Sequence, residues 1–225
     1  NYEKCFIFHY GLRYFLLSKI AGIKNIFSYG ILKKNENIVD KSRDFIIKKL
    51  NLKNPNFEFK INFQGGAEKK EQITFGIGGS GKDKKWDINH YINLGILLNE
   101  KKKFQILIAG GKYEIEDANY IIQNLKSKNI DAISLCNLDI KSSLPFLTSS
   151  KLYVGNDTGF MHLSGCLGVK SFGLFGRTSI NYCSYNNNII PISLPKDQRM
   201  NISRSDAINF IKPEYVLNFL ISSGL

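Results

Sequence analysis

From Ile73 onward the sequence alternates between short apolar runs and amphipathic stretches, and this alternation restricts the fold more than any other feature. The apolar runs predict strands at Ile73–Ile77, Phe104–Ala109, Ala132–Leu135, Leu152–Val154 and Ser171–Phe175. The intervening stretches predict helices near Asn89–Leu98, Ile115–Lys126, Ser143–Leu147 and Met161–Leu167. Strands and helices that alternate in this way predict an α/β fold, in which helices cover both faces of a parallel sheet. Ligands bind such sheets beyond the carboxyl ends of the strands.

The first part of the sequence shows the same alternation with fewer elements. It predicts strands at Lys4–Phe8 and Asn25–Tyr29, and helices at Leu12–Ile20 and Asp40–Leu50. These elements are too few for a complete doubly wound domain. We therefore expect residues 1–62 to be the remnant of an N-terminal Rossmann-like domain, and residues 63–225 to form a complete C-terminal one that ends in a tail helix.

Composition narrows the classes of partner. The 31 Lys and Arg residues against 19 Asp and Glu residues give a net charge of +12, which suits nucleic acid, a membrane surface or an anionic small substrate. The basic residues are scattered over many segments, so we predict no nucleic-acid partner. No apolar run approaches the roughly 18 to 20 residues of a membrane helix, and no signal peptide is visible, so we predict a cytoplasmic protein. The four cysteines lack a ligand-like spacing, and we predict no metal site.

The most informative motif for function is Gly155-Asn156-Asp157-Thr158-Gly159-Phe160-Met161-His162, at a predicted strand-to-helix turn. A helix that begins there directs free backbone N–H groups and the positive end of its dipole outward, as phosphate sites do. Gly159 permits close approach of a ligand, Thr158 adds a hydroxyl, and His162 lies one helical turn further along. An equally good interpretation at this point is that Asp157 or Thr158 only caps the helix.

A glycine-rich segment, Gly76 to Trp86, follows the first of these strands. Gly76, Gly81 and Lys82 have the spacing of a P-loop, but Asp83 stands where Ser or Thr would hold Mg²⁺, and its charge would repel phosphates. A true P-loop is therefore disfavoured. The glycines still permit close approach of an anion, and the lysines of the segment, Lys82, Lys84 and Lys85, suit a diphosphate. The alternative is a solvated basic loop with Trp86 packed on the core.

Two further strand ends carry polar residues. Glu114 follows Ala109-Gly110-Gly111 and is placed to accept hydrogen bonds from the hydroxyls of a ribose, or else it is a first-turn residue favoured by the helix dipole. Arg177, after Phe175-Gly176, is a phosphate ligand or simply exposed.

The order and spacing of these motifs resemble the C-terminal half of the lipopolysaccharide heptosyltransferases, glycosyltransferase family 9. The resemblance runs from about Ile73 to Thr178 and is carried by Gly79-Ser80, Lys84-Lys85-Trp86, Gly110-Gly111-Lys112-Tyr113-Glu114, Gly155 to Leu163, Leu167-Gly168-Val169 and Leu174 to Thr178. The segments Met200-Asn201-Ile202 and Lys212 to Val216 resemble the end of the family's domain. Phe160, Asp87 and Arg177 replace prolines that are usual in the family, which bears on sugar and acceptor specificity.

The resemblance implies a GT-B enzyme that transfers a heptose from an ADP-sugar to the inner core of lipopolysaccharide or a similar glycan, with inversion and without a metal ion or other cofactor. It places Lys84 at the diphosphate, Glu114 at the ribose, and the remaining donor-binding residues at the phosphate and sugar end, namely Ser80, Asp157, Thr158, Gly159 and His162. The implied partners are the nucleotide-sugar donor and a lipid-linked glycan acceptor, reached by peripheral contact with the inner face of the inner membrane. The sequence sets no oligomeric state.

The family's catalytic aspartate lies in the first strand-turn-helix of its N-terminal domain, and we expect this general base to lie outside the present sequence. His9 follows a strand and is a weak substitute, since a single His at a strand end is more often structural. Two alternatives therefore stay open: a nucleotide-sugar-binding protein without activity, and, with less support, a P-loop phosphotransferase.

Overall fold

The computed structural model describes residues 2–9, 11–30, 37–65, 68–177, 179–183, 185–203 and 206–225, without the side chains of residues 82, 182, 199 and 200. The chain forms two compact units, Asn1–Glu58 and Phe59–Leu225. Thr178 of the last motif lies outside the described residues. The predicted domain boundary after residue 62 remains a prediction. The same holds for the role of the first domain in binding the acceptor and of the second in binding the donor.

The first unit is a small parallel sheet with two helices. Its elements are β1 (Lys4–Ile7), α1 (Leu12–Ile20), β2 (Asn25–Ser28) and α2 (Ile38–Leu50). The Asn37 side chain caps α2 by accepting a hydrogen bond from the Val39 amide. Phe45 of α2 packs edge-on against the rings of Phe6, Phe8 and Tyr29. These aromatic contacts hold α2 on the sheet.

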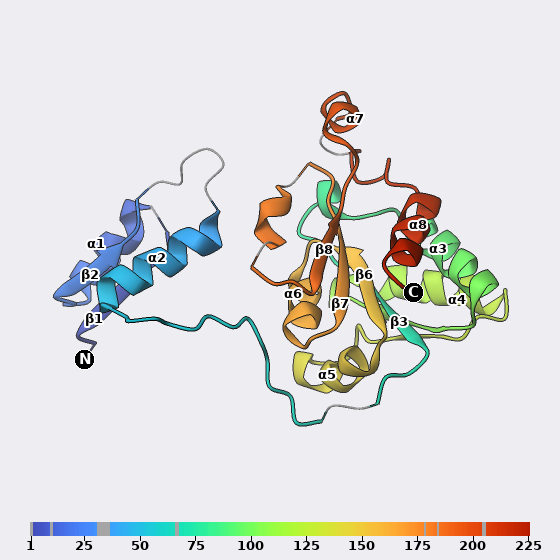
Figure 1. The fold of residues 1–225 in the computed structure, drawn as a ribbon, viewed down its shortest axis with the longest axis horizontal. Helices are drawn as coiled ribbons and strands as arrows, with labels where there is room; N and C mark the ends of the chain where they lie inside the picture. The colour runs from blue at the N-terminus through green and yellow to red at the C-terminus, as the bar shows by residue number, and fades with distance from the viewer. Residues whose placement is uncertain are drawn as a thin grey trace. The chain divides into compact units, whose positions relative to one another are not determined.

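The second unit is built on a six-stranded parallel sheet (Figure 1). Its strand order is β5 (Ala132–Ser134), β4 (Gln105–Ala109), β3 (Gln72–Gly76), β6 (Leu152–Asn156), β7 (Lys170–Leu174) and β8 (Ile189–Ile192). The chain builds outward from β3 to β5 and then returns to place β6 on the other side of β3. The strand order therefore reverses between β3 and β6, at the position where α/β sheets bind ligands.

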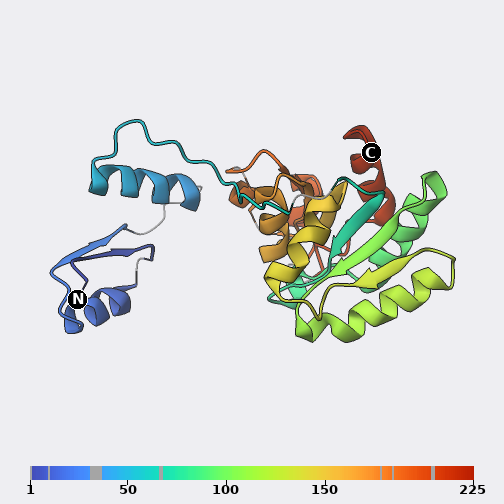
Figure 2. The same ribbon diagram turned by 90° about the horizontal axis from the view of Figure 1, so that it is seen from below.

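Helices cover both faces of this sheet, as the side-chain alternation along the strands requires. On one face Ile73, Phe75, Val154 and Phe172 pack with α3 (Ile88–Lys101), α4 (Ile115–Lys126) and α8 (Pro213–Ser222). On the other face Tyr153 packs with Met161 of α6 (Gly159–Cys166), and α5 (Ile140–Ser149) precedes β6. Figure 2 shows the sheet between its helices from a second direction. The α/β fold predicted from the sequence is confirmed.

The sequence prediction missed β8. Its sequence, Ile189-Ile190-Pro191-Ile192, contains a proline, which removes a ladder donor and disfavours a strand. The structure places β8 at the edge of the sheet, beside β7 only, where a proline is tolerated. The prediction also shortened α5 at both ends, since the predicted Ser143–Leu147 is Ile140–Ser149 in the structure. The remaining elements are the short turns η1 (Lys82–Lys84), η2 (Lys112–Glu114) and η3 (Ile180–Cys183), and α7 (Lys196–Met200).

Candidate functional site

The carboxyl ends of β3 and β6 meet at Gly76 and Gly155, which pair across the ladder. A Cβ on Gly76 would lie 1.6 Å from the Tyr153 hydroxyl oxygen, and a Cβ on Gly155 would lie 2.4 Å from the Gly76 carbonyl oxygen. Both contacts are far shorter than van der Waals distance, so these two positions need glycine. The loops that leave the two strands consequently start close together.

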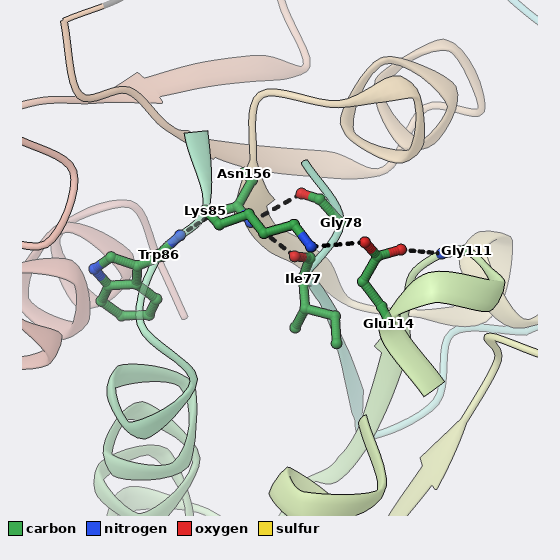
Figure 3. A network of polar contacts seen from close by, with 7 residues as sticks. All are labelled: Ile77, Gly78, Lys85, Trp86, Gly111, Glu114 and Asn156. Atoms are coloured by element: carbon green, nitrogen blue, oxygen red, sulfur yellow. Dashed lines mark hydrogen bonds and ion pairs between the residues drawn. The ribbon is translucent and has the colours of Figure 1, made fainter. Parts of the chain in front are cut away.

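Asn156, the last residue of β6, ties these loops to each other (Figure 3). Its side chain is fully buried and donates to the carbonyls of Ile77 and Gly78, at 3.0 and 2.9 Å. Its oxygen accepts from the Trp86 amide and the Tyr91 hydroxyl, both at 3.0 Å. One amide side chain thus fixes the glycine-rich segment and the Lys84-Lys85-Trp86 segment relative to β6.

Glu114 lies at the end of η2 and is nearly buried. One of its carboxylate oxygens accepts from the Gly111 amide at 2.8 Å, and the other lies 2.8 Å from Lys85 Nζ (Figure 3). The first contact is a helix-capping interaction, as the structural interpretation of Glu114 expects. The second contact brings a lysine of the glycine-rich segment to the carboxylate expected at the ribose.

Asp157 links two further candidate residues. Its carboxylate oxygens lie 3.5 Å from Lys84 Nζ and 3.6 Å from His162 Nε2. The interaction with His162, followed by the positive charge of Lys84, lowers the pKa of the Asp157 carboxyl. Asp157 is therefore a carboxylate at neutral pH. It lies between Lys84 and His162, the two side chains expected to contact the diphosphate and sugar end of the donor.

His162 is oriented from its other side by Tyr185. The Tyr185 hydroxyl lies 2.5 Å from His162 Nδ1, and the two rings stack with their centroids 5.7 Å apart. Tyr185 packs in turn against Phe59, at the beginning of the second unit. Burial raises the pKa of the Tyr185 hydroxyl, so the hydroxyl keeps its proton, and the tautomer of His162 sets which of the two groups donates. Tyr185 thereby holds the imidazole with Nε2 toward Asp157.

The helix that begins at Gly159 keeps its N-terminal amides free of a side-chain cap. Thr158 is the N-cap residue, yet its side chain makes no capping hydrogen bond, and its Oγ1 is buried without a partner among the described residues. A Cβ on Gly159 would meet nothing within 4 Å, so the fold itself does not require glycine there. The capping interpretation of Thr158 is therefore not realised.

The glycine-rich segment does not lead into a helix as a P-loop does. Its residues Lys82–Lys84 form a single 3-10 turn, and α3 begins only at Ile88, where the Asp87 side chain caps it. Phosphates in a P-loop rest on a helix that starts at the lysine, so the P-loop alternative loses its structural basis. Trp86 packs in the core and donates from Nε1 to the Ile211 carbonyl at 2.7 Å, as its structural interpretation expects.

Residues 8–210 match the family model of glycosyltransferase family 9 (heptosyltransferase). The chain belongs to glycosyltransferase family 9. It is 34% identical over 142 residues to lipooligosaccharide heptosyltransferase 2 of Campylobacter jejuni, which covers 60% of this chain and 44% of that protein. The chain thus spans less than half the length of the curated relatives it matches.

Solved structures of the family share the fold. The ADP-heptose LPS heptosyltransferase II of E. coli superimposes with a TM-score of 0.74 at 18% identity, over 98% of this chain and 76% of that chain. E. coli heptosyltransferase WaaC with ADP gives 0.75 at 17% identity, over 100% and 73%. The fold expected from the sequence resemblance, an α/β fold of GT-B type, is confirmed by these neighbours.

Within this family 9 fold, the structure groups most of the candidate residues but not all. Lys84, Asp157 and His162 form one group at the ends of β6 and η1, next to Thr158 and Gly159. Glu114 joins the site through Lys85. Ser80 is exposed in the loop before η1, and among the described residues no hydrogen bond or ion pair links its side chain to the other candidates.

Sequence reasoning missed two residues that organise the family 9 site, Asn156 and Tyr185. Asn156 stood inside the quoted motif, and its position at the end of an apolar strand was the available signal. Tyr185 lies 23 positions after His162 in an irregular segment, and no sequence pattern connects the two.

The other sequence expectations concern residues away from this group. Arg177 is exposed. His9 accepts a hydrogen bond from the Gly11 amide and packs on Tyr14, which fits a structural residue. In the part of the chain that the structure describes, no three His, Cys, Asp or Glu side chains cluster in a way that could hold a metal ion.

Proposed function

We propose that this family 9 chain binds an ADP-sugar at the carboxyl ends of β3 and β6 and transfers a heptose, or a related sugar, to an inner-core lipopolysaccharide or similar glycan acceptor. The observation that carries the proposal is the grouping of Lys84, Asp157 and His162 beside the uncapped amino end of α6. Such a grouping at the switch point of a parallel sheet suits a nucleoside diphosphate.

The chemistry of sugar transfer explains why these groups belong together. When the anomeric bond breaks, the departing nucleoside diphosphate gains negative charge, and fixed positive groups aimed at it stabilise the transition state. Lys84 supplies an ammonium group, and the amides of Gly159 and Phe160 supply oriented dipoles. Asp157 acts as an orienter of Lys84 and His162, since a carboxylate in direct contact with phosphate would repel it.

Glu114 is proposed to accept hydrogen bonds from the ribose. Its capping contact to the Gly111 amide fixes one carboxylate oxygen, and the ammonium group of Lys85 lies at the other. The glycine-rich segment passes close to this carboxylate, since a Cβ on Gly78 would lie 3.8 Å from Glu114 Oε2. In this arrangement Lys85 can pair either with the Glu114 carboxylate or with a phosphate of the donor.

We further propose that the transfer inverts the anomeric centre by direct displacement and needs no metal ion. Lys84, His162 and the helix dipole would then take the charge-stabilising role that Mg²⁺ has in other nucleotide enzymes. The acceptor hydroxyl must lose a proton during attack, and a positioned carboxylate contributes about 10²- to 10⁴-fold to such a step. We assign this general base to no residue of the present sequence.

The proposed acceptor is lipid-linked, which would bring the protein to the inner face of the inner membrane. Among the residues described, no helix has the length and apolar character needed to cross a membrane. The positive net charge of +12 supports contact with an anionic surface.

Calorimetry with ADP in the presence of a chelator tests the proposal. We expect binding by the wild-type chain, and at least tenfold weaker binding by Lys84→Ala and by Asp157→Ala. Unchanged affinity in both variants would show that the nucleotide binds elsewhere. A turnover assay with ADP-heptose and an inner-core acceptor then separates a transferase from a protein that only binds the donor.

A further inference from the structure

A second cluster of charge lies at the amino edge of the same sheet, opposite the candidate donor site. Lysines stand at the amino ends of the four adjacent strands β4, β3, β6 and β7, and they are Lys102, Lys69, Lys151 and Lys170. Because these strands are parallel neighbours, their amino ends form one edge. Lys151 precedes Asn156 along β6 by five residues, which corresponds to about 16 Å at 3.3 Å per residue.

These lysines border a pocket of about 260 Å³. Apolar side chains from the end of the core form its wall, and they are Phe104, Leu152, Phe172 and Leu220. We call this pocket, with its four lysines and four apolar side chains, the amino-edge pocket. It combines a positively charged rim with an apolar wall.

The lysines of the rim are only partly neutralised. Glu71 pairs with Lys102 at 2.9 Å and with Lys151 at 2.5 Å. Lys69 donates to the Ser150 carbonyl at 2.7 Å, and Lys170 donates to the Ser223 carbonyl, so both bond to groups without net charge. Within the described part of the chain, the four ammonium groups of the rim thus pair with a single carboxylate, that of Glu71.

We propose that the amino-edge pocket binds an amphiphilic anion, with a phosphate or carboxylate head at the lysine rim and a short apolar chain against the wall. An anion would supply the negatively charged partner that Lys69 and Lys170 lack. It would also favour the ammonium form of Lys69, whose pKa is lowered by burial. The apolar chain would cover the end of the core and remove its apolar surface from water, which favours binding.

The volume of the pocket limits the size of this ligand. At about 30 Å³ for a water-sized group, 260 Å³ holds on the order of nine such groups. Butyl phosphate, with its phosphate head and four carbons, has this size and serves as the probe. Inorganic phosphate and butanol supply the head and the tail separately.

Calorimetric titration of the full chain with the three probes tests the proposal. We expect butyl phosphate to bind at least tenfold more tightly than inorganic phosphate or butanol, and to do so equally in saturating ADP. The double variant Lys69→Gln/Lys170→Gln should lose at least tenfold in affinity. The double variant Lys126→Gln/Lys141→Gln, which removes the same charge from exposed positions on α4 and α5, should bind as the wild type does.

Three results would overturn the inference: equal affinity for butyl phosphate and inorganic phosphate, displacement of butyl phosphate by ADP, or unaltered binding by the folded Lys69→Gln/Lys170→Gln variant. A sedimentation experiment with vesicles of phosphatidic acid or phosphatidylcholine identifies the source of the ligand. Lysine-dependent binding to phosphatidic acid alone indicates a lipid headgroup, and binding of butyl phosphate without vesicle binding indicates a soluble ligand.

Discussion

Lys85 Nζ lies 2.8 Å from Glu114 Oε1, so the carboxylate expected to meet a ribose already has a cation beside it. The pair joins the glycine-rich segment after β3 to the turn after β4, two loops at the same edge of the sheet. The carboxylate is also held by the Gly111 amide, which fixes its orientation before any ligand arrives. The sequence interpretations of Glu114 as a capping residue and as a ribose ligand are therefore compatible with each other.

Replacement of Glu114 by Gln separates these two roles. The amide oxygen of Gln can still accept from Gly111, so we expect the free energy of unfolding to change by less than about 1 kcal/mol. The loss of the charged acceptor should weaken ADP binding about tenfold, or about 1.4 kcal/mol. Urea denaturation and calorimetry on the same samples check both values. ADP affinity equal to that of the wild type would leave Glu114 with the capping role alone.

Asn156→Ala should destabilise the second unit severely. The substitution removes four hydrogen bonds and leaves buried groups such as the Trp86 amide and the Ile77 carbonyl without a partner. Since each buried unsatisfied group costs about 1–3 kcal/mol, we expect a loss of about 3–5 kcal/mol in urea denaturation. Asn124→Ala on the exposed surface of α4 is the matched control, with a change of less than about 1 kcal/mol. A loss equal to that of the control would contradict the linking role of Asn156.

Gly155 and Gly159 should respond differently to replacement by Ala. At Gly155 the new Cβ meets the Gly76 backbone, so we expect little folded protein. At Gly159 the new Cβ meets nothing within 4 Å, and the unfolding midpoint should stay close to that of the wild type. If a diphosphate lies against the amino end of α6, Gly159→Ala should nevertheless weaken ADP binding at least tenfold. Normal ADP binding by the folded Gly159→Ala variant would show that no phosphate of ADP binds at the amino end of α6.

The Asp157 carboxyl should titrate below its ordinary pKa of 3.8, and ¹³C NMR of the side-chain carboxyl measures this directly. A folded-state pKa below the unfolded value means that the stabilisation is fully present above the unfolded pKa and disappears as pH falls through the folded one. His162→Ala removes the largest cause of the shift and should raise the pKa toward 3.8. His90→Ala, outside the group, should leave it unchanged. A pKa that stays low in His162→Ala would assign the shift to Lys84 alone.

The sequence predicted most of the sheet because its central strands are apolar runs with clear ends. It missed β8, where Pro191 lies in an edge strand, since only the neighbouring strand shows that this position needs no ladder donor. It grouped Ser80 with the other candidates because Ser80 belongs to a motif, whereas the loop leaves its side chain exposed. The role of Tyr185 depends on a contact across 23 residues, which no local pattern encodes.

The sequence by itself determined the family, the alternation of strands and helices, and the strand ends that carry the polar residues, because these follow from local periodicity and motif order. Only the tertiary structure decided which polar residues act together: Lys85 with Glu114, Lys84 and His162 with Asp157, and Asn156 between two loops. It also brought the lysines of the amino-edge pocket together from four strands. The physical reason is that strand order, and with it the neighbours of each strand end, depends on non-local packing of the whole sheet.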